Sequence, residues 1–474
     1  MEKKNLNYLE TEKIPTLMRK YALPCIISLL VGALYNIVDQ IFIANAAYLG
    51  SYGNAANSVV YPLTVVALAI AVLVGDGACA FVSLCLGSKN NRDANKSVGN
   101  AITLSLLFGI ILTLIYFLFQ EPILTLFGGK VNDLTFQYSK EYFTFISLGV
   151  PFYMFGQAMN PIIRSDGSPN TAMAIALCGA AVNIVLDPIC IYVLKWGMMG
   201  AAIATITGQI LVAGLSVYQM MHLNTVTISK KCFIPELRIC IRTLTLGISS
   251  FLAQIALVVS IAAMQNMIVK YCAYDAVFSL AEYSQIPMAV VSIVMKVFQI
   301  VVSISIGLAS GCIPIVSYNI GAGRKDRAKQ LFKDLLLYEA TVGLIATIIV
   351  EVFPNQLINI FGAQGESIYY TQFAIRAFRT YLCTMVLACV NKAICINLQA
   401  MGKALPSTLL SLLREFVFGV GYTLILPMFF GLYGLLYTMP AADISTFIIS
   451  IFVVIYTIKY LNKPVEADDY TSLH

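Results

Sequence analysis

Charged residues are scarce in this sequence. Only 11% of its 474 residues are Asp, Glu, Lys or Arg, while 59% are hydrophobic and the mean hydropathy is +0.81. In soluble domains about a quarter of all residues are charged, so this composition excludes an ordinary soluble protein. We expect the chain to bury most of its length in a lipid bilayer.

Histidine is nearly absent, and the cysteines are not paired in sequence. The chain has two histidines, one of them the C-terminal residue, and its twelve cysteines lie mostly in apolar stretches without a C-x-x-C motif. These absences argue against a histidine-based metal site and against a disulfide framework. We expect the cysteines to pack as small buried hydrophobic side chains.

Long apolar stretches occupy most of the sequence. A helix needs roughly 20 apolar residues to cross about 30 Å of hydrocarbon. We therefore predict an all-α membrane protein with twelve transmembrane helices. The predicted spans are residues 21–46, 56–86, 97–121, 136–163, 169–194, 199–222, 241–269, 286–319, 329–353, 368–401, 404–428 and 432–459.

Basic residues gather in alternate connections between these spans. Lys and Arg precede span 1, follow spans 2, 8 and 12, and fill the segment between spans 6 and 7, whereas the other connections hold few. The positive-inside rule places both termini and these connections in the cytoplasm. We expect a multi-pass protein of the inner (plasma) membrane, and lipid headgroups account for the basic clusters without a nucleic-acid partner.

The two halves of the chain resemble each other at an offset of 234 residues, the difference between positions 77 and 311. The matched segments are 75–87 with 309–321, 126–128 with 360–362, and 197–200 with 431–434. Each segment lies at the same point of its half, which indicates a repeat of six spans. The glycine matches include Gly77 with Gly311 and Gly87 with Gly321.

A six-span repeat determines how the halves are related. Because six is even, both halves insert with the same orientation, and we predict two six-helix lobes related by a pseudo-two-fold axis along the membrane normal. The predicted parts are an N-terminal lobe over residues 1–222, a cytoplasmic linker over 223–240 and a C-terminal lobe over 241–474.

One aspartate lies inside an apolar stretch. Asp187 is the only charged residue between Ala172 and Leu194, and a carboxylate in hydrocarbon is costly unless it is neutralised, paired or facing water. Pro188 cannot donate a backbone hydrogen bond and should kink the helix. Asn183 lies one turn before Asp187 on the same face. We expect a polar site here that binds a proton or a hard cation.

Two further polar residues fall at the depth of Asp187. Asp39 lies about two turns from the outer end of span 1, and Thr205 lies at a similar depth in span 6. The predicted cation site is therefore Asp39, Asn183, Asp187 and Thr205. Two carboxylates at one depth would hold a shared proton or a cation such as Na⁺. The alternative is that each polar residue is satisfied within its own helix, which threonine does readily.

Other charges also lie within the predicted spans. Asp76 follows a glycine, but the G-x-G-D motif of an intramembrane aspartyl protease is absent. The remaining charges are predicted to form structural ion pairs in the second half, the alternative being that they line a cavity there. The pairs are Lys392 with Arg414 and Glu415, and Lys296 with Asp443.

Four motifs resemble those of the multidrug and toxic compound extrusion (MATE) family, and are most similar to its MepA-like branch. The resemblance covers essentially the whole chain. The motifs are Pro24 with residues 34–43, residues 164–169, residues 183–188, and residues 307–321 followed by Gly323 and Arg324.

The resemblance implies a secondary active multidrug efflux antiporter with two lobes in a V. Such a protein exports amphipathic, often cationic compounds in exchange for Na⁺ or H⁺ by alternating access. The family motifs also imply the cation site named above, with Na⁺ there as the only possible metal, and no cofactor besides the coupling ion. They place Tyr35, Asn36, Tyr142 and Asn160 in the substrate cavity, although Asn160 lies near the inner end of its span. We expect the chain to act as a monomer.

Two other classes of function fit the sequence less well. A flippase for lipids or lipid-linked oligosaccharides would favour Arg and Lys in its cavity, and none lies near the predicted acidic site. An enzyme would need a nucleophile, metal or acid-pair motif that we do not find, so we expect no enzymatic activity. A passive channel would conduct without a driving gradient.

Overall fold

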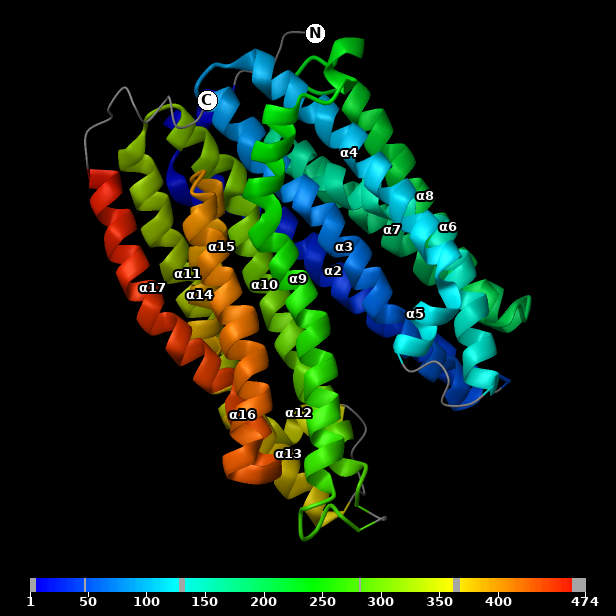
Figure 1. The fold of residues 1–474 in the computed structure, drawn as a ribbon. Coiled ribbons are helices and arrows are strands. Elements are labelled where there is room, and N and C mark those ends of the chain that lie inside the picture. The colour runs from blue at the N-terminus through cyan, green and yellow to red at the C-terminus, as the bar shows by residue number, and fades with distance from the viewer. Residues whose placement is uncertain (1–5, 47, 128–132, 281–282, 361–366, 463–474) are drawn as a thin grey trace.

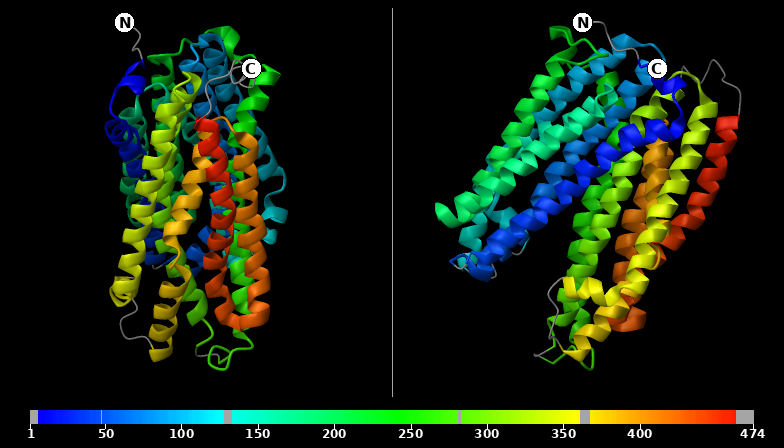
Figure 2. Two further views of the ribbon diagram at one scale, coloured as in Figure 1. Left: turned by 90° about the vertical axis from the view of Figure 1, so that its left-hand side faces the viewer. Right: turned by 180° about the vertical axis from the view of Figure 1, so that it is seen from behind.

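The computed structural model describes residues 6–46, 48–127, 133–280, 283–360 and 367–462, and all regular structure in these ranges is helical. The helices form two lobes. The lobes converge at the end where both termini lie and diverge toward the other end, so the molecule has the shape of a V (Figure 1 and Figure 2).

The N-terminal lobe contains six long helical spans. A short helix, α1 (Tyr8–Thr11), precedes them, and α5 (Gln120–Leu126) joins the third span to the fourth. The spans are α2 (Ile14–Asn45), α3 (Gly50–Gly87), α4 (Asn91–Leu118), α6 (Asp133–Ser165), α7 (Pro169–Pro188) with the π-helix η2 (Ile189–Val193), and α8 (Gly197–Met221).

The C-terminal lobe repeats this arrangement. Short helices η3 (Lys230–Phe233), α12 (Pro354–Ile360) and η5 (Gly431–Tyr437) lie in its connections. Its spans are α9 (Leu237–Cys272), α10 (Ile286–Gly321), α11 (Lys325–Val352), α13 (Ile368–Tyr381) with α14 (Met385–Ala400), α15 (Ala404–Leu412) with the π-helix η4 (Leu413–Val420) and α16 (Gly421–Phe430), and α17 (Thr438–Asn462).

The twelve predicted spans are confirmed, although apolarity alone finds fewer. Among the described residues, length and hydropathy single out nine helices, or ten when α13 and α14, bent by 41°, count as one. The segment Ala404–Asn462 contains two spans, and α6 is the twelfth, with Lys140 and Glu141 in its sequence. The last span begins at Thr438 rather than at the predicted position 432, because η5 occupies the preceding residues.

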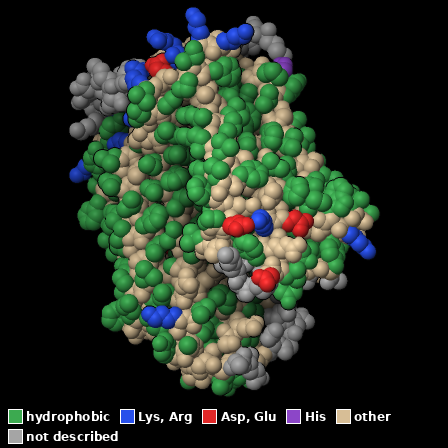
Figure 3. Space-filling model, turned by 45° about the vertical axis from the view of Figure 1, so that its right-hand side comes forward, with side chains coloured by type: hydrophobic (Ala, Val, Ile, Leu, Met, Phe, Trp, Pro, Cys, Tyr) green, Lys and Arg blue, Asp and Glu red, His purple; other side chains and the backbone are tan. Residues whose placement is uncertain are grey.

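Hydrophobic side chains cover the outside of the spans. On α4, for example, Leu107, Ile110, Ile111 and Leu114 are exposed. Figure 3 shows such side chains over most of the face in view, with many Lys and Arg side chains at the end where the termini lie. A surface of this kind suits hydrocarbon, where the helices satisfy their own backbone groups.

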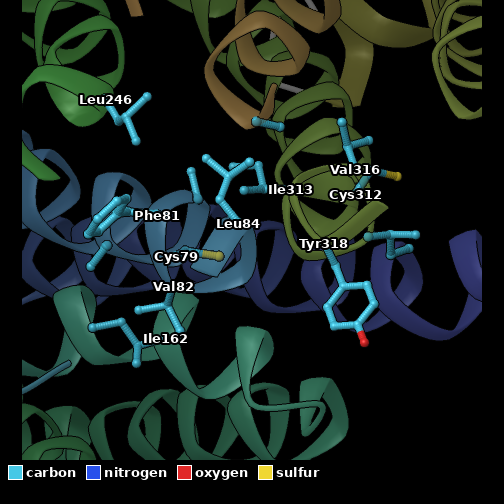
Figure 4. Close-up of a cluster of buried hydrophobic side chains, with 14 of the residues drawn as sticks. Cys79, Phe81, Val82, Leu84, Ile162, Leu246, Cys312, Ile313, Val316 and Tyr318 are labelled. Carbon is cyan, nitrogen blue, oxygen red and sulfur yellow. The ribbon is translucent and has the colours of Figure 1, made fainter. Parts of the chain in front are cut away.

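The lobes share one hydrophobic core where they converge. This core joins residues of α3, including Cys79 and Leu84, to Leu246 of α9 and to Cys312 and Ile313 of α10 (Figure 4). Toward the diverging end, by contrast, each lobe has a separate core of its own within the described residues. All twelve cysteines are unpaired and ten are buried, as predicted.

Repeat-matched glycines form close contacts between the lobes. A Cβ added to Gly87 of α3 would lie 2.1 Å from the carbonyl oxygen of Tyr318, and one added to Gly321 of α10 would lie 2.1 Å from that of Leu84. The backbones of α3 and α10 therefore touch across the pseudo-two-fold axis. The second matched pair of segments lies partly outside the described residues.

The first matched glycines show the same symmetry. A Cβ on Gly77 of α3 would lie 2.0 Å from the Thr243 carbonyl oxygen of α9, and one on Gly311 of α10 would lie 2.6 Å from the Cα atom of Ala22 on α2. The second span of each lobe thus packs against the first span of the other. We call these four glycines, Gly77, Gly87, Gly311 and Gly321, the glycine seam.

Buried polar groups also connect the lobes. Asp76 of α3 lies 4.0 Å from the Arg164 guanidinium of α6 and accepts a hydrogen bond of 3.0 Å from the Ser250 hydroxyl of α9. The same hydroxyl lies 3.2 Å from Gln399 Oε1 of α14. Arg164 falls just beyond the predicted span 136–163, but it is inside α6 and buried, so the ion pair of Asp76 was not predicted.

The connection between the lobes is held to the N-terminal lobe. Asp166, between α6 and α7, accepts hydrogen bonds from the backbone N–H groups of Asn224 and Thr225 at 2.8 and 2.7 Å. Lys96 of α4 contacts Glu236 at 2.5 Å, and this hydrogen bond holds the pKa of the Glu236 carboxyl below its usual value. The start of α9 is thereby positioned beside α4.

Candidate cation site

Two aspartates of the N-terminal lobe meet inside the protein. Asp187 is 0% exposed and Asp39 is 7% exposed, and their carboxyl groups lie close enough to act on each other. Asp187 is the penultimate residue of α7. The following Pro188 ends the α-helix, and the chain continues as a π-helix, a geometry that often occurs at functional sites.

An asparagine connects this pair to a neighbouring helix. The Asn183 side-chain amide donates to Asp187 Oδ1 and to Thr205 Oγ1 of α8, both at 3.3 Å. Thr205 also lies near the buried Tyr142 hydroxyl. A small residue allows this approach, since a Cβ on Gly208 would lie 2.8 Å from a carbonyl oxygen of α7.

Three buried oxygens of the cluster have no hydrogen-bond donor within the described chain. They are Asp39 Oδ1, Asn183 Oδ1 and Asp187 Oδ2. No Lys or Arg of the described residues forms an ion pair with either aspartate. A buried carboxylate without a counter-charge is strongly disfavoured, so the cluster has the donor set and the charge of a site for a small positive ion.

Two neighbouring buried carboxyls favour a proton. Two ionised carboxylates repel each other and both lack a donor hydrogen, and a proton on one of them removes both problems. The four residues present oxygen ligands, which also suit a hard cation such as Na⁺. Within the described chain, no group of three or more His, Cys, Asp and Glu side chains forms a denser metal site.

The four residues expected in the substrate cavity lie in different places. Tyr35 and Tyr142 are near enough to both aspartates for the carboxylate charges to act on their hydroxyls. Asn36 is exposed, and its amide donates to the Gly32 carbonyl of its own helix at 2.8 Å. Asn160 donates to the Ala172 carbonyl at 3.0 Å and so joins α6 to α7, away from the aspartates.

Charges within the C-terminal lobe form a buried network. Glu415 lies 2.6 Å from both Lys392 and Arg414, and Arg414 lies 3.0 Å from Asp443. The predicted ion pairs of Lys392 and Arg414 with Glu415 are confirmed. The predicted pairing of Asp443 with Lys296 is wrong, because Arg414 on the neighbouring span reaches Asp443 instead.

Breaking this network should destabilise the protein strongly. Arg414→Met would leave Asp443 buried without its cation, and removing one partner of a buried ion pair costs about 3–5 kcal/mol. Lys140→Ala is the control, because it breaks an exposed pair with Glu121 at 2.6 Å, which contributes roughly 0–1 kcal/mol. Thermal unfolding of purified protein would compare the two. Equal midpoints for both variants would contradict a structural role of the network.

Sequence analysis overlooked one buried acid, Glu339 of α11. It is 0% exposed and lies within the predicted ninth span. The principle that singled out Asp187, a charge inside an apolar stretch, applies to it equally.

The architecture is that of a membrane transporter, with two repeated six-span lobes and an acidic group at membrane depth. The chain belongs to the MatE family, whose family model matches residues 24–189 and 249–425. The members of this family are transporters.

Relatives and solved structures agree over nearly the whole length. The multidrug export protein MepA of Staphylococcus aureus (strain MSSA476) is 24% identical over 94% of both chains, and that of Staphylococcus haemolyticus (strain JCSC1435) is 24% identical over 96%. An outward-facing MATE transporter superposes with a TM-score of 0.87 at 21% identity, covering 98% of this chain and all of the other. The MATE multidrug transporter DinF-BH gives 0.85 at 27% identity and covers 96% and 98%.

Proposed function

We propose that the protein is a multidrug efflux antiporter that exports amphipathic, often cationic compounds in exchange for H⁺ by alternating access. The observation that carries this proposal is the neighbouring pair Asp39 and Asp187, both buried, each with an unpartnered carboxyl oxygen, and without a basic partner among the described residues. The names of the relatives, which are multidrug export proteins, support the substrate class.

The arrangement of the lobes corresponds to an outward-open state in this proposal. The positive-inside rule puts the converging end, with both termini and most basic connections, in the cytoplasm. The lobes then diverge toward the outside, and the shared core and the glycine seam close the inner side. Export requires that this inner contact opens in another state of the cycle.

Helix α2 connects the acidic site to the lobe contact. Its C-terminal half carries Asp39, and its N-terminal half carries Ala22 and Ile26, which pack on Gly311 and Gly307 of α10. A proton removes the repulsion between the Asp39 and Asp187 carboxylates, and its release restores it. The position of α2 against α7 thus depends on the bound ion, as coupling between ion and substrate requires.

The substrate is proposed to bind beside this helix. Asn36 follows Ala22 by fourteen residues, so the two lie about 40° apart around α2, and Asn36 faces the side on which the C-terminal lobe lies. Tyr35 and Tyr142 lie at the edge of the acidic site. Aromatic rings and an amide suit a flat cationic compound through cation–π contact and hydrogen bonding.

Transport in proteoliposomes tests the proposal, with the flat aromatic cation ethidium as the probe. We expect an imposed pH gradient to drive accumulation of ethidium against its concentration gradient, and we expect addition of ethidium to dissipate that pH gradient. A Na⁺ gradient of equal size is the control. If only the Na⁺ gradient drove transport, the coupling ion would be Na⁺ and not H⁺.

Two other outcomes would support the rival functions. Transport of labelled lipid without ethidium movement would support the flippase, and ethidium flux without any gradient coupling would support a channel.

A further inference from the structure

A second acid is buried at membrane depth, in the C-terminal lobe. Glu339 lies fourteen residues from the start of α11, about 21 Å along the helix, and is 0% exposed. The Ser305 hydroxyl of α10 donates to Glu339 Oε2 at 2.6 Å, and Oε1 has no hydrogen-bond partner within the described chain. The acidic site of the N-terminal lobe does not include this residue.

No counter-charge of the described residues reaches this carboxyl. The titratable groups that face it are the thiols of Cys312 on α10 and Cys389 on α14. No charged group in the described parts of α2, α12, α13 or α17 acts on it. The nearby basic residues Lys392 and Arg414 are already bound in their own network. An ionised Glu339 would therefore be an uncompensated charge in a dry, apolar setting.

The surroundings suit a proton better than a metal cation. Besides the carboxyl, the polar oxygen bonded here is that of Ser305, and the other polar neighbours are two thiols. A hard cation needs several oxygen ligands. A proton needs only the carboxyl itself, and a protonated glutamic acid can still accept the hydrogen bond from Ser305.

Helix α10 connects Glu339 to the contact between the lobes. Ser305 precedes Gly307 by two residues, and a Cβ on Gly307 would lie 2.6 Å from the Ile26 Cα atom of α2. Separation of α2 from α10 would therefore move the Ser305 hydroxyl that donates to Glu339. Gly343, one turn beyond Glu339, packs equally closely on α14 within the same lobe. Of the three helices around Glu339, α10 makes by far the most extensive contact with the other lobe.

We propose that Glu339 with Ser305 is a second proton-binding site, which exchanges its proton when the contact between α2 and α10 opens. This inference rests on the proposed transport cycle only for the exchange step. Protonation itself follows from burial without a counter-charge and can be tested in the resting protein.

Infrared spectroscopy tests protonation. In full-length Asp39→Asn/Asp187→Asn protein in nanodiscs at neutral pH, we expect a C=O band of a protonated carboxyl. Adding Glu339→Gln should remove this band, whereas adding Glu351→Gln should not. Glu351 is on the same helix but is more exposed and paired with Arg379 at 3.7 Å. A background without the band, or a band that survives Glu339→Gln, overturns the proposal.

Transport tests the exchange. Glu339→Gln imitates the protonated acid, so it should fold with an unchanged thermal midpoint and still exchange labelled for unlabelled ethidium. It should nevertheless lose at least tenfold in efflux driven by a pH gradient, while Glu351→Gln retains the full rate. Full gradient-driven efflux by Glu339→Gln overturns the exchange step. If the wild-type protein shows no gradient-driven efflux, the proposed function fails instead, and the infrared result still decides whether the site is protonated.

Discussion

Replacing Asp187 or Asp39 by Asn is expected to abolish efflux driven by an ion gradient. Asparagine has the size of aspartate and keeps a carbonyl oxygen, which at position 187 can still accept from Asn183. It has neither the charge nor the titratable proton of aspartate. The coupling ion then binds both conformations of the transporter equally poorly, so an ion gradient cannot shift the equilibrium between them. Accumulation of ethidium against its gradient should fall to the level of empty liposomes.

Folding should survive these substitutions. Each removes a buried carboxyl that lacks a basic partner among the described residues, so unfolding should occur at the same or a higher temperature than in the wild type. Asp133→Asn is the matched control, because Asp133 is an exposed acid of the same lobe, in the first turn of α6. Gradient-driven efflux should be unchanged in this control. Wild-type efflux by both site variants would remove the pair from the mechanism.

The fold could be predicted because its main determinant is simple. Transfer of apolar side chains into hydrocarbon sets the spans, and an even repeat sets the symmetry. The details that were missed depend on contacts between helices. The first residue of α17 depends on the turn η5. The most apolar stretch of helix α6 is less apolar than those of the other spans, and its packing against α3 and α8 holds the helix in place.

The sequence could predict the depth of each candidate site residue in the membrane, but not the side of its helix on which it lies. The constant rise of a helix places Asp39, Asp187 and Thr205 at one level, and the structure brings all three into one cluster with Asn183. Depth does not determine which face a residue occupies. Asn160 bonds across to α7 instead, and Asp443 binds Arg414 because the rotation of the last two spans brings these two side chains together.

Adding one methyl group at the glycine seam should weaken the contact between the lobes at their converging end. In Gly321→Ala the new Cβ would lie 2.1 Å from the Leu84 carbonyl oxygen, and backbone atoms on both sides leave no flexible side chain to move aside. Overpacking of a tight contact costs about 1–3 kcal/mol. We expect a lower unfolding temperature, reduced efflux, and faster labelling by a water-soluble maleimide of Cys312, which is 1% exposed in the closed seam.

Gly214→Ala is the control. It separates the steric clash at position 321 from the gain in helix propensity that any Gly→Ala substitution in a helix brings. Gly214 lies in α8 with nothing within 4 Å of its added Cβ, so alanine there should be neutral or stabilise by up to about 1 kcal/mol. The two substitutions are chemically identical and are expected to change stability in opposite directions. If Gly321→Ala behaved like Gly214→Ala, with Cys312 still protected, the α3–α10 contact would not be the inner closure that the proposed cycle requires. Alternating access would then have to depend on another contact between the lobes, such as the hydrogen bond from Ser250 to Asp76.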